Sequence, residues 1–577
     1  MIFPSASKHR RVCASKQQER QSQIDALPQY AAQLTLSEEK IHSLPIPQLV
    51  AQCRSGSLKP STILMAYGKK ALLAHKATNC VTDFMFEEAL STASIADWGQ
   101  GLESDSSITD KTRERSLLGV PVSIKDTVDI EGHDTTFGYS CNVGRPAIAS
   151  AGIVRMLQDA GALVHVKTSV PTSLIALETY SDVYGLTKNP YNPAFGVGGS
   201  TGGGGALIAC GGAKIEIGTD VAGSVRIPAH FCGIWSLKAS LGRFPSWGTG
   251  SSIPGLEAIP IVASPMAGSL DDLHEFWKRI MLAEPWQYDH TCVPLAWRDV
   301  NLQDEGRKLK WGVIWEDGAV PPTPACRRAL ATVISALKKQ GHEVVDFNPP
   351  DVLSGLKVAN QLLFSDGGSQ IQRPLSPGEK LSHATTSIIG LLQMPRFIKN
   401  ILAWFMSSTD PLSSDLHKLM HTKTVVEERD LVVARDRYRA EWHQKWIEEG
   451  LDFVLTVPSP FPATEHGASE KTTLISAGYT FLFSLLDYSA GVMPVTHVDR
   501  ELDALPPNFE ATKVYKSLTT VAKLGYGVYD ANKMHGLPLG VQIAGRRLEE
   551  EKVLQGMHVI ENALLEQKSS FFNTLKL

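Results

Sequence analysis

Residues 197–228 read VGGSTGGGGALIACGGAKIEIGTDVAGSVRIP, and this stretch decides the fold. Its glycines allow positive φ and a close approach of the backbone to a ligand. Ser200 precedes a run of small residues that predicts a helix start, where N–H groups lack partners. The alternating run KIEIGT, residues 214–219, predicts a strand that ends in a turn carrying Ser224. Small residues at 222 and 223 would leave N–H groups near Ser224 available to an oxyanion.

A glycine-rich turn has more than one interpretation. A phosphate cradle is disfavoured, because no Gly-Lys-Ser/Thr follows the glycines. A lone serine in such a turn is usually structural, but Ser200 and Ser224 are a pair, 24 positions apart (224 − 200). His230 and Cys232 lie close to Ser224 in sequence and offer a Ser–His or Cys–His alternative.

Lys125 ends the strand-like run LLGVPVSIKD. A lysine at a strand end is usually a solvated charge. Burial would lower its pKa and allow the neutral amine to act as a base. Lys125, Ser200 and Ser224 could then serve as base, hydroxyl shuttle and nucleophile.

Three blocks, GVPVSIKD, GGSTGGGGA and GTDVAGSVRIPA, resemble the catalytic blocks of the amidase signature family. The spacings, 75 (200 − 125) and 24, agree with that family's pattern. Segments near residues 78, 166, 284, 484 and 534 resemble fungal acetamidases and, more loosely, fatty-acid amide hydrolases. The resemblance extends over residues 30–565.

The resemblance implies a mixed α/β fold, in which a central β-sheet is covered by helices on both faces. It implies hydrolysis of a small-molecule amide through an acyl-enzyme on a Lys-cisSer-Ser triad, without a cofactor. Lys125 matches the base, Ser200 the serine after the cis peptide, and Ser224 the nucleophile. The remaining positions match the oxyanion-hole backbone (Val221, Ala222, Gly223, Ser224, with Ser200 beside them) and its structural support (Thr201, Asp220, Arg226).

Three residues depart from the family's usual motifs. Thr201 replaces a serine, Gly204 stands where the family usually has glutamate, and Ala222 replaces a glycine. If position 222 required positive φ, alanine would cost about 1 kcal/mol.

Two rival functions remain open at this stage. One is an acyl-transfer or biosynthetic amide enzyme with the same triad, and the other is a non-catalytic binding or scaffold protein. A subunit of a glutamine-dependent tRNA amidotransferase is disfavoured, because segments outside the three blocks resemble the acetamidase branch.

Composition excludes several other classes. The 577 residues are 43% hydrophobic and 20% charged with a net charge of −4, which is typical of a soluble globular protein without nucleic-acid partners. The eight cysteines form no Cys-x-x-Cys pair and the 17 histidines no His-Glu-x-x-His, so no metal site is predicted. We expect a cytoplasmic protein, although the C-terminal Leu-Lys-Leu is close to a peroxisomal address.

The chain is predicted to have three parts: a flexible N-terminal arm (1–30), a single amidase domain (31–565) and a C-terminal tail (566–577). Strand-like and helix-like runs alternate in the middle, and residues 413–449 predict one long charged helix. A charged, flexible loop is expected at residues 103–115.

Residues 388–406 are apolar but are interrupted by Pro395, Arg396 and Lys399, so they predict no transmembrane span. A buried or lid helix pair is the favoured interpretation. The alternative is an apolar entrance for a hydrophobic substrate or weak contact with a membrane surface, since the fatty-acid amide hydrolases, which the chain resembles, have an apolar cap. The sequence leaves the oligomeric state open, a homodimer included.

Overall fold

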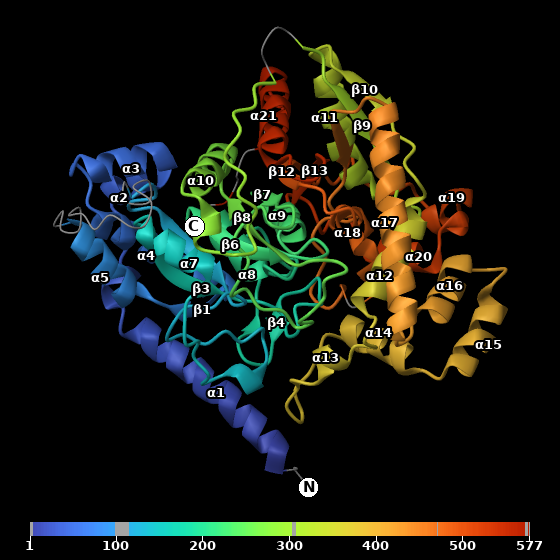
Figure 1. Ribbon diagram of the computed structural model, residues 1–577, viewed down its shortest axis with the longest axis horizontal. Helices are drawn as coiled ribbons and strands as arrows, with labels where there is room; N and C mark the ends of the chain where they lie inside the picture. Colours follow the sequence, from blue (N-terminus) through green and yellow to red (C-terminus); the bar gives the residue numbers. More distant parts are fainter. Residues whose placement is uncertain are drawn as a thin grey trace.

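The computed structural model describes residues 4–97, 115–302, 307–469, 471–472, 474–569, 571 and 575. An 11-stranded mixed sheet runs through the molecule in the order β1-β3-β2-β6-β8-β7-β12-β13-β11-β9-β10 (Figure 1). The strands are β1 (Val81–Phe84), β2 (Pro121–Lys125), β3 (Leu163–Thr168), β6 (Ile215–Asp220), β7 (Trp235–Lys238), β8 (Val262–Ala267), β9 (Lys310–Val313), β10 (Glu343–Asp346), β11 (Phe453–Thr456), β12 (Ala490–His497) and β13 (Pro538–Ala544), with a separate β4 (Tyr180–Ser181)–β5 (Gly185–Leu186) hairpin.

Helices surround this sheet. They are α1 (Pro4–Asp25), α2 (Leu36–Ser43), α3 (Ile46–Arg54), α4 (Pro60–Thr78), α5 (Phe86–Asp97), α7 (Gly152–Asp159), α8 (Gly202–Ala209), α9 (Arg226–Cys232), α10 (Leu270–Leu282), α11 (Pro324–Lys339), α12 (Val352–Leu363), α13 (Ser369–Gln372), α14 (His383–Gln393), α15 (Arg396–Met406), α16 (Pro411–Leu419), α17 (Val425–Glu448), α18 (Gly478–Leu485), α19 (Lys513–Ser517), α20 (Thr520–Tyr526) and α21 (Glu550–Glu566).

Both faces of the sheet are covered, as predicted. Alternate side chains of β6 point to opposite faces: Ile215 and Ile217 join the core that contains α10 and α21. On the other face, α8 and α9 contribute to a second core, which reaches β12 through Val492. The site residues sit where β2 and β6 end and α8 and α9 begin.

The N-terminal segment differs from the flexible arm that the sequence predicted. Residues 4–25 form α1, which lies along the outside of the body (Figure 1). Lys16 forms an ion pair of 3.0 Å with Asp134, and the Arg20 guanidinium donates to the Val81 carbonyl at 2.9 Å. The helix has no apolar stripe, so it docks through such polar contacts, which the sequence pattern could not reveal.

The predicted long charged helix at 413–449 is two helices, α16 and α17. The break has a local cause, because Thr424 and Glu427 form a capping box that starts α17. The Glu427 N–H donates to Thr424 Oγ1 at 3.2 Å, and the Thr424 N–H donates to Glu427 Oε2 at 2.8 Å.

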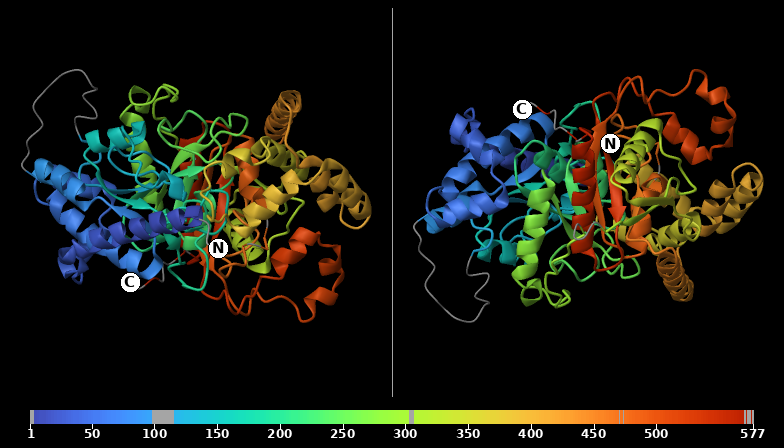
Figure 2. Two further views of the ribbon diagram at one scale, coloured as in Figure 1. Left: turned by 90° about the horizontal axis from the view of Figure 1, so that it is seen from below. Right: turned by 90° about the horizontal axis from the view of Figure 1, so that it is seen from above.

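The apolar segment at 388–406 is divided between α14 and α15, which are separated at Pro395. Together with α16 these helices project from one end of the molecule (Figure 2). The pair is only partly buried: one side of α15 exposes the large apolar residues Phe397, Ile401, Trp404 and Phe405. Among the helices that the structure describes, none is long and apolar enough to cross a membrane. Most of the predicted loop at 103–115, and the end of the chain at 576–577, lie outside the described residues.

Candidate active site

Lys125 is the last residue of β2 and is fully buried. Its Nζ donates to Ser200 Oγ at 2.8 Å and to Thr219 Oγ1 at 2.9 Å. Ser200 follows a cis peptide bond from Gly199 and lies just before α8. Two of the predicted residues, from parts of the chain 75 positions apart, are therefore in direct contact.

The surroundings of Lys125 favour a neutral amine. Burial lowers the pKa of Lys125 from its ordinary value to about 7, although the carboxylates of Asp220 and Glu216 act in the opposite direction. An amine with this pKa is present in its basic form near neutral pH.

Ser224 lies in the turn between β6 and α9, with 9% of its surface exposed. It lines the same small cavity as Ser200 and Thr219. The Thr201 N–H donates to the Ser224 carbonyl at 3.0 Å, which joins the turn to the start of α8. The structure thus brings all three predicted triad residues to one place.

The turn before Ser224 needs one glycine. Gly223 has φ +130°, and a Cβ there would lie 2.3 Å from Thr480 Oγ1. Thr480 Oγ1 itself donates to the Ala222 carbonyl at 2.6 Å. Ala222 does not adopt positive φ, so the strain considered for alanine at this position does not arise.

Part of the predicted oxyanion hole is not available, because Asp220 already accepts hydrogen bonds from N–H groups of the turn. The Gly223 N–H donates to Asp220 Oδ1 at 2.8 Å, and the Val225 N–H donates to Asp220 Oδ2 at 3.2 Å. The N–H groups of Val221, Ala222 and Ser224 remain the candidates for binding an oxyanion.

The ion pair between Asp220 and Arg226 stabilises the turn that carries Ser224. Both are fully buried, and Arg226 Nη2 and Nε donate to the two carboxylate oxygens at 2.8 and 3.0 Å. Arg226 also donates to the Thr480 carbonyl, to Ser484 Oγ and to Gln542 Oε1 at 2.7–2.9 Å. Arg226 holds the pKa of Asp220 below its usual range despite burial. Breaking such a pair by removing one partner typically costs about 3–5 kcal/mol.

His230 and Cys232, the alternative catalytic residues near Ser224 in sequence, make hydrogen bonds to other parts of the chain. His230 Nδ1 accepts from the Gly540 N–H at 2.8 Å, and its Nε2 lies 3.1 Å from the Phe461 carbonyl oxygen, so both ring nitrogens are occupied. Cys232 is buried and its thiol donates to the Val197 carbonyl.

The Thr201 hydroxyl has no hydrogen-bond partner among the described residues. Nor does the described part of the chain contain a group of His, Cys, Asp or Glu side chains that could hold a metal ion.

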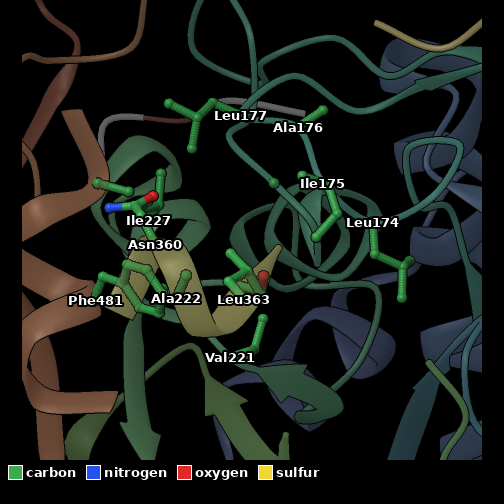
Figure 3. Close-up of a pocket in the computed structure, with 14 residues that line it drawn as sticks. Leu174, Ile175, Ala176, Leu177, Val221, Ala222, Ile227, Asn360, Leu363 and Phe481 are labelled. Carbon is green, nitrogen blue, oxygen red and sulfur yellow. The ribbon is translucent and has the colours of Figure 1, made fainter. Parts of the chain in front are cut away.

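An apolar pocket opens beside Ser224 (Figure 3). One wall is the loop Leu174–Leu177, another is α12 with Asn360 and Leu363, and a third is α18 with Phe481. No sequence pattern identifies these residues as pocket residues, because they lie far apart in the chain and carry no motif. The positive φ of Leu174, 64°, is a feature that only the structure shows.

A second, larger cavity adjoins this pocket. It has a volume of about 440 Å³ and shares Ala176 and Leu177 with the first. Its polar wall includes Glu178, whose carboxylate lies 2.6 Å from His466 Nδ1. The apolar pocket that Ser224 lines therefore shares part of its wall with a cavity of mixed polarity.

The chain has many known relatives. A family model described as Amidase matches residues 62–554. An acetamidase of Aspergillus oryzae is 33% identical over 539 residues, which is 92% of this chain and 91% of the relative. Fatty-acid amide hydrolase 1 of Sus scrofa is 31% identical over 532 residues, covering 92% and 87%. A solved structure of a fatty acid amide hydrolase superposes with a TM-score of 0.81 at 26% identity, covering 97% of this chain and 95% of that chain.

The family model covers most of the chain, including both serines, the buried lysine and the braced turn between β6 and α9. The chain therefore belongs to the amidase signature family of enzymes, which hydrolyse the carbon–nitrogen bonds of amides.

Proposed function

We propose that this enzyme cleaves its amide through an acyl-enzyme on Ser224, with Lys125 as base and Ser200 as proton shuttle. The observation that carries the proposal is the buried Lys125 amine, which has a pKa of about 7 and is 2.8 Å from Ser200 Oγ. Neutral Lys125 takes up the proton that Ser224 loses, through the Ser200 hydroxyl. Ser224 Oγ then attacks the amide carbonyl carbon.

The rest of the cycle returns this proton. The backbone N–H groups of the turn stabilise the tetrahedral oxyanion, at about 3 kcal/mol for each donor. The relay delivers the proton to the leaving nitrogen, which departs as ammonia or an amine. Water then adds to the acyl-enzyme by the same relay and releases a carboxylate.

We place this reaction in the cytosol, where the eight cysteines, which form no disulfide with one another, would stay reduced.

The pocket beside Ser224 suits an apolar acyl group. Its lining is almost entirely aliphatic or aromatic, and Asn360 is one of its few polar side chains. Such a lining gains from burying apolar surface and offers little to a charged acyl group. The adjoining cavity with Glu178 and His466 is the space into which the amine part of the substrate would extend.

Hydrolysis is tested by product analysis on a panel from acetamide to long-chain and aryl amides. We expect a carboxylate and an amine in equal amounts, highest rates for apolar acyl groups, and the same rates with EDTA. Hydroxylamine should divert part of the acyl group to a hydroxamate, as expected for an acyl-enzyme. An added natural amine that captures nearly all of the acyl group would instead establish acyl transfer. A metal-dependent rate, or no turnover of any amide, would contradict the proposal.

We also propose that α15 contacts a membrane surface. Phe397, Ile401, Trp404 and Phe405 recur at helical spacing and are 52–71% exposed, so they form one apolar stripe. Trp404 and Phe405 pack edge to face at 4.9 Å, a cluster suited to the interfacial region of a bilayer.

Co-sedimentation with phosphatidylcholine vesicles containing phosphatidylserine tests this contact. The variant Phe397→Ser/Trp404→Ser is expected to lose most vesicle binding and to keep its reactivity at Ser224. Ile148→Ser is the matched control, because Ile148 is an exposed apolar residue outside this helix. Equal vesicle binding by the parent protein and the double variant would refute the contact.

A further inference from the structure

Glu216 is a buried carboxyl group for which the mechanism has no role. It is fully buried in β6, and it accepts hydrogen bonds from Ser123 Oγ of β2 and, at 2.6 Å, from Thr168 Oγ1 of β3. Ser123 lies two residues before Lys125 on the same face of β2. The carboxyl group of β6 thus joins β2, the strand that carries the base, to β3 on its other side.

The same carboxyl group fills the space in front of Gly204 in α8. A Cβ at Gly204 would lie 2.4 Å from Glu216 Cδ and 2.5 Å from Oε1. Gly204 therefore has no room for a side chain while Glu216 is present. Position 204 is also where the family's usual motif has glutamate. The geometry places the carboxyl group of β6 in the space that a glutamate on α8 would enter.

We propose that Glu216 is a positioning residue that replaces a carboxylate from α8: it joins β2 and β3 against α8 and supplies negative charge to Lys125. This inference rests on the proposed role of Lys125 as the base. Gly204 and Glu216 are then a matched pair, in which the glycine makes room for the carboxylate.

Charge balance around the base gives Glu216 a distinct effect. The charged groups that act on Lys125 are Asp220 and Glu216, both from β6. Asp220 is largely neutralised by its two hydrogen bonds from Arg226 of α9. Glu216 has only neutral hydroxyl partners, and Lys125 is the cation that acts on it. Burial raises the pKa of Glu216 to about 7, so the two groups titrate as a coupled pair.

Glu216→Gln keeps the shape of the side chain and removes its charge. Without this charge the protonated amine loses stabilisation, so the pKa of Lys125 should fall. We expect the pH at which fluorophosphonate labelling of Ser224 is half-maximal to shift downward by roughly half a unit or more. The plateau rate should fall several-fold, because a weaker base accepts the proton less readily.

Glu550→Gln is the matched control. Glu550 is a second fully buried glutamate, on α21, which accepts from the Ser240 N–H at 2.7 Å. Its variant should keep the parent's pH profile. An unchanged profile in Glu216→Gln, with normal folding, would refute the electrostatic role.

Exchange of the two residues tests whether Gly204 and Glu216 form a matched pair. Gly204→Glu alone brings two carboxylates into one space, and Glu216→Gly alone removes the carboxylate that accepts hydrogen bonds from Ser123 and Thr168. Each single variant should lose at least about tenfold in labelling rate or in folded yield. The double variant Gly204→Glu/Glu216→Gly should recover most of this loss, together with half-maximal labelling near the parent's pH. Losses that simply multiply in the double variant would overturn the inference.

The two proposals fail differently. If the parent protein is not labelled at Ser224, or is labelled at a rate independent of pH, the proposed function itself fails. If the parent is labelled with a rise near pH 7 but Glu216→Gln matches it and the exchange shows no recovery, only the role of Glu216 is wrong. Should Glu216→Gln not fold, the exchange alone decides.

Discussion

Ser224→Ala is expected to abolish covalent labelling by a fluorophosphonate and to lower amide turnover by about a millionfold, the scale seen when a serine nucleophile is removed. In the labelling step Ser224 Oγ attacks phosphorus, fluoride leaves, and the serine proton passes to the Lys125–Ser200 relay. Ser224 is the serine placed in the turn between β6 and α9 and in the pocket. Intact-mass and peptide mass spectrometry of the labelled protein give the measurement.

Ser251→Ala is the matched control for this experiment. Ser251 lines the same small cavity as Ser224 and Ser200, and its hydroxyl accepts from the Ile253 N–H at 2.9 Å. It carries no part of the relay, so its variant should label at close to the parent's rate. Thermal unfolding should show that Ser224→Ala remains folded. A label that persists in folded Ser224→Ala would place the nucleophile elsewhere.

The residues of the relay could be found in the sequence because they lie in local patterns. The strand-like run before Lys125 and the glycine-rich turns around Ser200 and Ser224 each follow from rules that act over a few residues. The mixed sheet followed from the family resemblance and from alternation of strand and helix patterns. The division of residues 413–449 into two helices was missed, although Thr424 and Glu427 supply the signal of a helix start.

The pocket could not be predicted in the same way. Leu174, Asn360 and Phe481 meet only because a loop and two distant helices pack over the end of β6. Glu216 is different, since a signal existed: it is a charged residue inside the β-strand pattern KIEIGT, at a position that a covered sheet buries. A buried charge requires partners, which the sequence alone does not identify.

Lys125→Ala should remove both the base and the acid of the relay. We expect amide turnover to fall by about 100-fold or more, the scale of one general acid–base catalyst. Matched esters should lose less, because an alkoxide leaves with less need of a proton than an amine does. Lys125→Arg should not restore the activity, since a guanidinium stays protonated and cannot accept the serine proton.

The pH profile of the parent enzyme also tests Lys125 as the base. The protonated form of Lys125 is inactive, so kcat/KM should rise with pH through its pKa of about 7 and level off above it. A lysine with its ordinary pKa of 10.5 would instead give a rise near that value. Matched amide and ester rates across pH 6 to 10 test both points.

Lys238→Met supplies the control for a buried amine outside the relay. Lys238 ends β7 and donates to the carbonyls of Ala239 and Tyr488 at 2.9 and 3.1 Å, and burial lowers its pKa to about 8. Its variant should retain the rise near pH 7.

Equal losses of amide and ester turnover in Lys125→Ala would deny Lys125 the protonation of the leaving group. A profile that still rises near pH 7 in Lys125→Ala would assign the titrating base to another residue, with Glu216 the first to examine because its pKa is also about 7.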